Sequence, residues 1–146
     1  MWRMLVALAL LSLVGGPPSA VAQDEGCPDT PEDTASELVG DFLASGQWDQ
    51  AYEVLHPEAQ LRVPRQVFAA ARQAQAIAAP VLDVEVFPAN VHPGWTWGIT
   101  GARFTAVSEV PVRVARAAPL GSVSDVEMIP LVRVGGCWRW LPPRLP

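Results

Sequence analysis

The positions of hydrophobic and polar residues first follow the spacing of a helix, beginning near residue 31. Apolar residues there recur at intervals that place them on one helical face: Leu38, Val39, Phe42 and Leu43. Thr30 can cap this helix, and Pro31 suits its first position, where an amide hydrogen is expendable. Gly46 is typical of a helix end, so the pattern predicts one helix from Pro31 to about residue 45.

Two shorter stretches further along the chain also have helical spacing. The first begins at Trp48 and ends before Pro57, and its apolar stripe consists of Trp48, Ala51, Tyr52 and Leu55. The second begins near Pro64 and runs to about Ala78, where Pro80 stops it. Its predicted buried side consists of Val67, Phe68, Ala71 and Ile77. The first half of the chain after residue 30 is therefore predicted to be helical.

From residue 81 onward the apolar positions alternate in the way typical of a strand. Leu82, Val84 and Val86 are predicted to share one face of the first strand, opposite Asp83 and Glu85. After a loop rich in proline and glycine, three further extended runs follow. The first contains Trp95 and Trp97 on one face, and the other two are residues 104–114 and residues 123–134. Within 104–114, the valines at 110, 112 and 114 share one face, and Glu109 and Arg113 lie on the other.

A two-residue turn, Gly135-Gly136, predicts a hairpin between residues 123–134 and residues 137–141. In this register Arg133 lies opposite Trp138, so we expect the guanidinium to stack on the indole. Trp140 lies opposite Leu131 in the same register.

Two prolines within the predicted strands, Pro111 and Pro130, cannot donate ladder hydrogen bonds, which predicts edge or bulge positions and a bent sheet. Helices followed by antiparallel strands are typical of an α+β domain. We therefore expect N-terminal helices packed on one face of a curved antiparallel sheet.

The first 22 residues have the order of a secretory signal peptide. A basic start is followed by an apolar run at 4–14, a breaker at 15–18 and the small residues Ala20-Val21-Ala22, so cleavage is expected after Ala22. The apolar run is shorter than the roughly 20 residues of a spanning helix, although an uncleaved anchor is the alternative. Residues 23–30 then form an extended arm and residues 31–146 a single domain. After cleavage, the protein is expected to be secreted, or to stay in the periplasm or cell envelope.

The two cysteines of an exported chain predict one disulfide, Cys27–Cys137. This bond would pin the arm to the last strand and, because it closes a long loop, stabilise the fold by about 4–5 kcal/mol. After signal cleavage, the chain contains nine arginines and fifteen acidic residues, so its net charge is negative. The negative charge disfavours nucleic acid or anionic lipid as a partner, and no stretch after residue 22 is long enough to span a membrane.

Three residues are candidates for acid–base chemistry. Asp83 and Glu85 lie two apart in a strand, a spacing of about 7 Å that could serve a pair of carboxylates, unless they only mark the solvated face. His92 lies in the loop beside Trp95, where it could reach a pocket rim. Histidines and cysteines lack the spacing of metal ligands, so neither a metal nor a cofactor is predicted.

Aromatic residues are the other candidates for a site. The pairs Trp95/Trp97 and Trp138/Trp140 could each form a platform for an apolar or sugar-like ligand, and packing in the core is the alternative. Tyr52, the only tyrosine, belongs to the apolar stripe of the second helix, where its hydroxyl either has a core partner or reaches a ligand.

Two segments carry a resemblance to a known family. One is the run Leu38-Val39, Phe42-Leu43, Gly46-Gln47-Trp48-Asp49, Ala51-Tyr52 and Leu55-His56-Pro57, and the other is the hairpin 132–140. Over residues 31–143 the chain resembles nuclear-transport-factor-2-like (NTF2-like) domains, the cystatin-like cone fold shared with ketosteroid isomerase and SnoaL-type cyclases. The resemblance implies a pocket between the helices and the concave sheet. Catalytic members place an acid or a histidine there, but none of their motifs matches residue by residue.

Two functional hypotheses follow from these observations. The first is an exported, non-catalytic domain that binds a small apolar ligand or a protein partner, or that forms a homodimer through its sheet. The second is an isomerase-like or cyclase-like enzyme that uses His92, Asp83 or Glu85 as a base. An enzyme of this kind needs a titratable group inside the cavity, whereas a binding domain does not.

Overall fold

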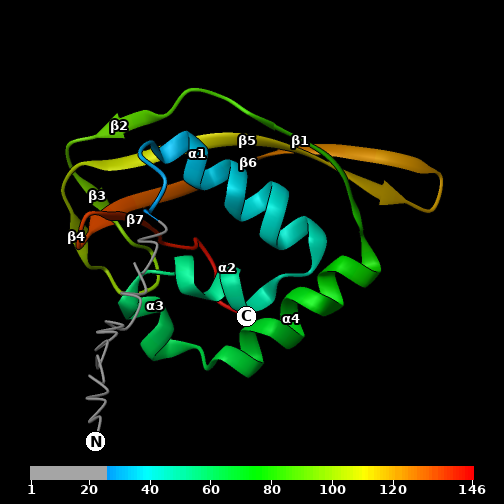
Figure 1. Ribbon diagram of the computed structural model, residues 1–146, viewed down its shortest axis with the longest axis horizontal. Coiled ribbons are helices and arrows are strands. Elements are labelled where there is room, and N and C mark those ends of the chain that lie inside the picture. Colours follow the sequence, from blue (N-terminus) through cyan, green and yellow to red (C-terminus); the bar gives the residue numbers. More distant parts are fainter. Residues whose placement is uncertain (1–25) are drawn as a thin grey trace, which may run out of the picture.

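A computed structural model describes residues 26–146, so the predicted signal peptide and the first residues of the arm lie outside the described part of the chain. Helices come first and strands follow, as predicted. Figure 1 shows the sheet arching over the helices, which occupy a separate layer on its inner side. The protein is therefore an α+β domain with helices on one face of a curved antiparallel sheet.

Helix α1 (Pro31–Ser36) begins where the sequence predicts. The Oγ1 atom of Thr30 accepts a hydrogen bond from the amide of Asp33 at 3.1 Å, which satisfies one of the free amides of the first turn. The helix continues directly into a π-helical segment, η1 (Glu37–Leu43), that the apolar spacing does not distinguish from an α-helix. Gly46, with φ of +80°, follows the end of this segment.

Helix α2 (Trp48–Val54) is confirmed. Ala51, Tyr52 and Leu55 of its predicted stripe are buried, whereas Trp48 is half-buried. A short helix that the sequence analysis missed, α3 (Pro57–Arg62), follows it immediately. Pro57 ends one helix and occupies the first turn of the next, where its missing amide hydrogen costs nothing. The Nδ1 atom of His56 accepts from the amide of Glu58 at 3.2 Å and so caps this helix.

Helix α4 (Arg65–Ala78) is the longest helix of the described residues. Phe68 is buried in the core as predicted, and Ala71 is half-buried. The prediction is wrong for two other residues, because Val67 is 50% exposed and Ile77 is 75% exposed. The inner face of α4 is therefore narrower than the sequence pattern indicates.

The sheet has the strand order β1-β5-β6-β7, all antiparallel, and β2 pairs with β5 beyond the end of β1. Its strands are β1 (Val81–Val86), β2 (Asn90–His92), β5 (Val107–Ala118), β6 (Gly121–Val134) and β7 (Cys137–Trp140). A small separate hairpin consists of β3 (Trp95–Thr96) and β4 (Arg103–Phe104). The predicted valines of β5, at 110, 112 and 114, are fully buried under the helices.

A bulge changes the predicted face of one residue in β1. Val81 pairs with Arg116 and Asp83 pairs with Ala115, so Leu82 is an extra residue between two neighbouring positions of β5. Leu82 is 60% exposed, and the prediction that it shares the inner face of Val84 is wrong.

The strand prolines do not occupy the predicted edge or bulge positions, because Pro111 lies in β5 and Pro130 in β6, the two interior strands of the sheet. Each nevertheless lies where a neighbouring strand has ended, so no ladder bond is lost. The carbonyl of Pro111 accepts from the amide of Phe87, just beyond β1, and the carbonyl of Pro130 accepts from the amide of Leu141, just beyond β7. Because the nitrogen and carbonyl of a strand residue face the same side, each proline ring faces the end of a neighbouring strand.

The closing hairpin has the predicted register. Gly135 and Gly136 adopt φ of 60° and 88°, values that a two-residue turn requires and glycine accepts most readily. Arg133 pairs with Trp138, and the guanidinium carbon lies 5.3 Å from the centre of the indole ring, so the expected stacking contact is confirmed.

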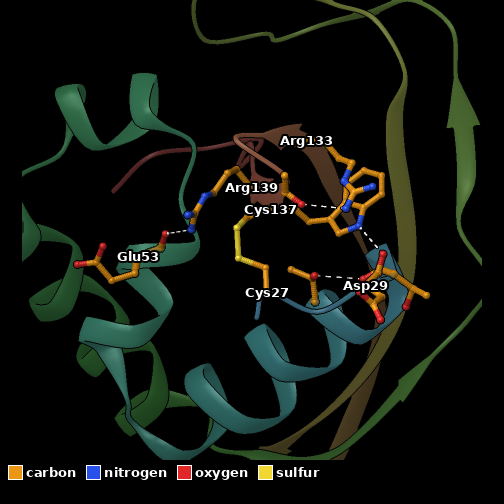
Figure 2. The surroundings of a disulfide bond; sticks show 10 residues. Cys27, Asp29, Glu53, Arg133, Cys137 and Arg139 are labelled. Carbon is orange, nitrogen blue, oxygen red and sulfur yellow. Dashed lines mark hydrogen bonds between the residues drawn. A yellow bond between two sulfur atoms is a disulfide. The ribbon is translucent and has the colours of Figure 1, made fainter. Parts of the chain in front are cut away.

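The predicted disulfide Cys27–Cys137 is present, with its Cα atoms 5.4 Å apart (Figure 2). It joins the arm before α1 to the start of β7. Two hydrogen bonds strengthen this junction: the Trp138 indole donates to the carbonyl of Asp29 at 3.2 Å, and Arg139 donates to the carbonyl of Glu53 in α2 at 2.6 Å. The last strand is thus held to both the arm and the helical layer.

Candidate functional site

A cavity of about 800 Å³ lies between α4, β6 and the C-terminal residues 143–146. Its lining consists of Ala71, Arg72, Ala74, Gln75, Glu127, Met128, Ile129, Trp140, Pro143, Arg144, Leu145 and Pro146. A recess of about 50 Å³ shares the central part of this lining and continues toward η1 and α2, where it reaches Val39, Leu43 and Trp48. Figure 1 shows α4 beneath the arch of the sheet. This cavity is the candidate functional site.

Arg72 is one of the residues that line both cavities. It follows Phe68 by one helical turn, so both side chains are on the same face of α4. Its guanidinium carbon lies 5.2 Å from the ring centre of Phe68 and also 5.2 Å from that of Trp140. Two aromatic rings therefore hold the cation by cation–π contacts.

The hydrogen-bonding capacity of Arg72 is only partly used. Its Nη1 atom donates to Oε1 of Gln75 at 2.8 Å, whereas the buried Nε atom donates to no acceptor among residues 26–146. Arg72 forms no ion pair with any acidic side chain of that range. Burial lowers the pKa of Arg72 from its ordinary value, with Glu127 opposing this effect, although an arginine remains charged at neutral pH.

Trp140 forms the part of the wall that faces Arg72. It is 4% exposed, and its buried Nε1 atom has no acceptor among the described residues. Its backbone is firmly placed, because its carbonyl accepts from the amide of His56 at 2.8 Å and the following amide, of Leu141, donates to Pro130. The backbone of Trp140 is therefore fixed at this wall, and its indole carries an unused donor.

Glu127 is the acidic side chain of the lining, and it already has a partner. It pairs across the strands with Val112, so it faces the inner side of the sheet, and its Oε1 lies 2.5 Å from Nη2 of Arg116. Three arginines, Arg72, Arg116 and Arg144, and the acidic side chain of Glu127 line the two cavities. The charged side chains here are mainly positive, in a chain with a net charge of −5.

The carboxylates predicted as acid–base candidates lie elsewhere. Asp83 and Glu85 are exposed on β1, and Glu85 pairs with Arg113, its neighbour on β5. Neither residue lines a cavity. The placement matches the solvated strand face that the sequence analysis offered as the alternative.

His92 lies on β2, at the edge of the sheet, and lines neither cavity. Its Nε2 is 2.7 Å from Oε2 of Glu109, close enough for an ion pair but outside hydrogen-bond geometry. The other oxygen of Glu109 accepts from the Trp95 indole at 2.9 Å. His92, Glu109 and Trp95 thus form a polar cluster that is separate from the cavity.

Of the five aromatic residues predicted to bind a ligand, only Trp140 lines the cavity. Trp97 is fully buried and donates to the carbonyl of Pro142 at 2.8 Å. Tyr52 is buried too, and its hydroxyl lies 2.9 Å from the carbonyl of Val63. Trp95 and Trp138 belong to the His92 cluster and to the disulfide junction, so the structure does not gather the five in one pocket.

The sequence analysis did not single out Arg72 or Glu127. A signal was present for Arg72, because a residue four positions after the buried Phe68 must lie on the inner face of the helix. Glu127 becomes a lining residue only through the pairing of β5 with β6, which periodicity within one segment does not reveal.

In the described part of the chain, no cluster of three or more histidine, cysteine or acidic side chains is arranged to hold a metal ion. None of the helices in residues 26–146 has the length and hydrophobicity needed to span a bilayer. Comparison with known proteins found no family whose sequence model matches this chain and no curated protein that matches it.

Proposed function

We propose that the protein is an exported, non-catalytic domain that binds a small, largely apolar ligand between α4 and β6. The observation that carries this proposal is the cavity of about 800 Å³, a volume within the usual range of small-molecule sites. Its wall combines alanine, methionine, isoleucine and tryptophan side chains with a few polar groups, a composition typical of ligand pockets.

Two further observations support the proposal. Helices that cover one face of a curved sheet, with a cavity between the layers, are what the resemblance to NTF2-like domains implies. The Cys27–Cys137 disulfide favours an oxidising compartment and hence export, in agreement with the predicted signal peptide.

The enzymatic alternative has less support from the geometry. A base of the predicted kind would have to face the cavity, and His92, Asp83 and Glu85 do not line it. Binding of a protein partner and homodimer formation through the sheet remain predictions.

Filling the cavity tests the proposal. Ala74 lines the cavity and is exposed, so Ala74→Trp places an indole in the ligand space without replacing a core residue. Ala70→Trp, at an exposed position on the same helix that lines neither cavity, is the matched control. The probe is Nile red, a neutral dye whose fluorescence rises in apolar surroundings.

We expect the wild-type protein and Ala70→Trp to bind the dye with similar affinity and Ala74→Trp to bind it at least about tenfold more weakly. Thermal unfolding of both variants reports whether the fold is intact. Equal binding by the two variants, or the absence of binding by the wild-type protein, would contradict a ligand site in this cavity.

A further inference from the structure

We infer that the ligand is a single-chain amphiphile with one carboxylate, and that this carboxylate pairs with Arg72. The inference rests on the proposed function, since it names the chemical class of the ligand for the same cavity. It comes from the charge and the unused donors of the wall, which an entirely apolar ligand would leave without a partner.

The first argument is the contrast between two arginines that line these cavities. Arg116 has a carboxylate partner, Glu127, at 2.5 Å. Arg72 has none within residues 26–146, although burial makes an unpaired cation more costly. The planar guanidinium of arginine matches a carboxylate in geometry, so an acidic ligand supplies the missing partner.

The second argument is a second donor at the same wall. Nε1 of Trp140 has no acceptor within residues 26–146, and neither has Nε of Arg72, while the guanidinium carbon of Arg72 lies 5.2 Å from the indole ring. A carboxylate has two oxygens and can accept from both groups. Both nitrogens are covered in the present conformation, so a side-chain rotation must accompany their engagement.

The remaining charges limit the ligand to one negative charge. Arg144 adds positive charge at the C-terminal wall and disfavours a cationic ligand, whereas Glu127 disfavours a second negative charge beside Arg72. A single acid group therefore suits the wall better than a phosphate monoester, which carries close to two charges at neutral pH. The chain of the amphiphile follows the apolar part of the lining, formed by Ala71, Ala74 and Ile129.

The experiment compares two probes of equal chain length, dodecanoic acid and dodecan-1-ol, by titration calorimetry at pH 7.5. We expect wild-type protein to bind the acid about ten- to a hundredfold more tightly, as a charged hydrogen-bonded pair would give. Arg72→Gln should lose this preference and bind the acid and the alcohol with similar affinity. Arg72→Lys, which keeps the charge without the planar fork, should retain part of it. Arg62→Gln, at an exposed position of α3 outside both cavities, is the matched control.

Equal affinity of the wild-type protein for acid and alcohol would overturn the inference and leave the proposed binding function intact. Binding of neither probe would overturn both. If Arg72→Gln fails to fold, the comparison of the two probes on the wild-type protein and on Arg72→Lys still decides, because an anion site must discriminate between them. Preference for the acid that survives in Arg72→Gln would assign the anion to another residue and refute the role of Arg72.

Discussion

Replacing both cysteines with alanine removes the disulfide cross-link between the N-terminal arm and the last strand. Cys27 is exposed and Cys137 is half-buried, so the substitutions delete little packed surface. The loss of stability should therefore come mainly from the unfolded chain, which gains conformational freedom once the bond is absent.

The bond joins residues separated by 110 positions. The chain-entropy relation gives about 16 cal/mol/K for a loop of this size, or about 5 kcal/mol at 25 °C. Small domains have unfolding free energies of about 5–15 kcal/mol, so the variant should lose a third or more of its stability. The hydrogen bonds of Trp138 to Asp29 and of Arg139 to Glu53 do not need the disulfide, so the native arrangement should persist.

Urea unfolding followed by far-ultraviolet circular dichroism measures the effect. The wild-type protein is examined with and without a reductant. The double variant is the control, because it has no disulfide for the reductant to break. We expect the reduced wild-type protein and the variant to unfold at the same, lower urea concentration. A loss below about 2 kcal/mol would refute the loop-entropy argument, because it lies outside the usual range for a native disulfide.

Two further perturbations test local features of the fold. Thr30→Ala removes the acceptor for the Asp33 amide and should lower the unfolding free energy by about 1 kcal/mol in urea titration, whereas Thr30→Ser should retain it. Burial lowers the pKa of His56 from 6.5, and Glu58 opposes this effect. The unfolded chain therefore takes up the proton at a higher pH than the folded protein does. As the pH falls through 6.5, the free energy of unfolding decreases. Thermal unfolding between pH 7.5 and 5.5 should show a smaller decrease for His56→Gln, and equal decreases would contradict this assignment.

Local sequence rules predicted those features that a few neighbouring residues determine. Thr30 and Pro31 place the start of α1, because a cap and its first turn lie within four residues. Gly135-Gly136 fixes the register of the closing hairpin, since a two-residue turn leaves no other pairing, and Arg133 therefore meets Trp138. The disulfide was predictable because the chain contains only two cysteines.

Other features depend on contacts between distant segments or on a single residue inserted into a strand. The bulge at Leu82 inserts one residue, and alternation along β1 alone contains no sign of it. Pro57 was interpreted as a stop, although the same residue suits the start of α3. The lining combines Arg72 from a helix, Glu127 from a strand and the C-terminal residues, which only the tertiary fold brings together.

The unsatisfied donors in the cavity wall lower the stability of the fold, and this cost favours a binding function over a purely structural one. A buried donor without an acceptor costs about 1–3 kcal/mol, and Arg72 and Trp140 each contain one at the same wall. Methionine or leucine at position 72 would pack between Phe68 and Trp140 without that cost, since apolar replacements of buried charges are often neutral or stabilising. The contacts of Arg72 with Phe68, Trp140 and Gln75 leave its Nε without an acceptor, which an acidic ligand would supply. On this argument Arg72→Met should be at least as stable as the wild-type protein in urea titration but lose the preference for dodecanoic acid, and a marked loss of stability would show that Arg72 serves the fold.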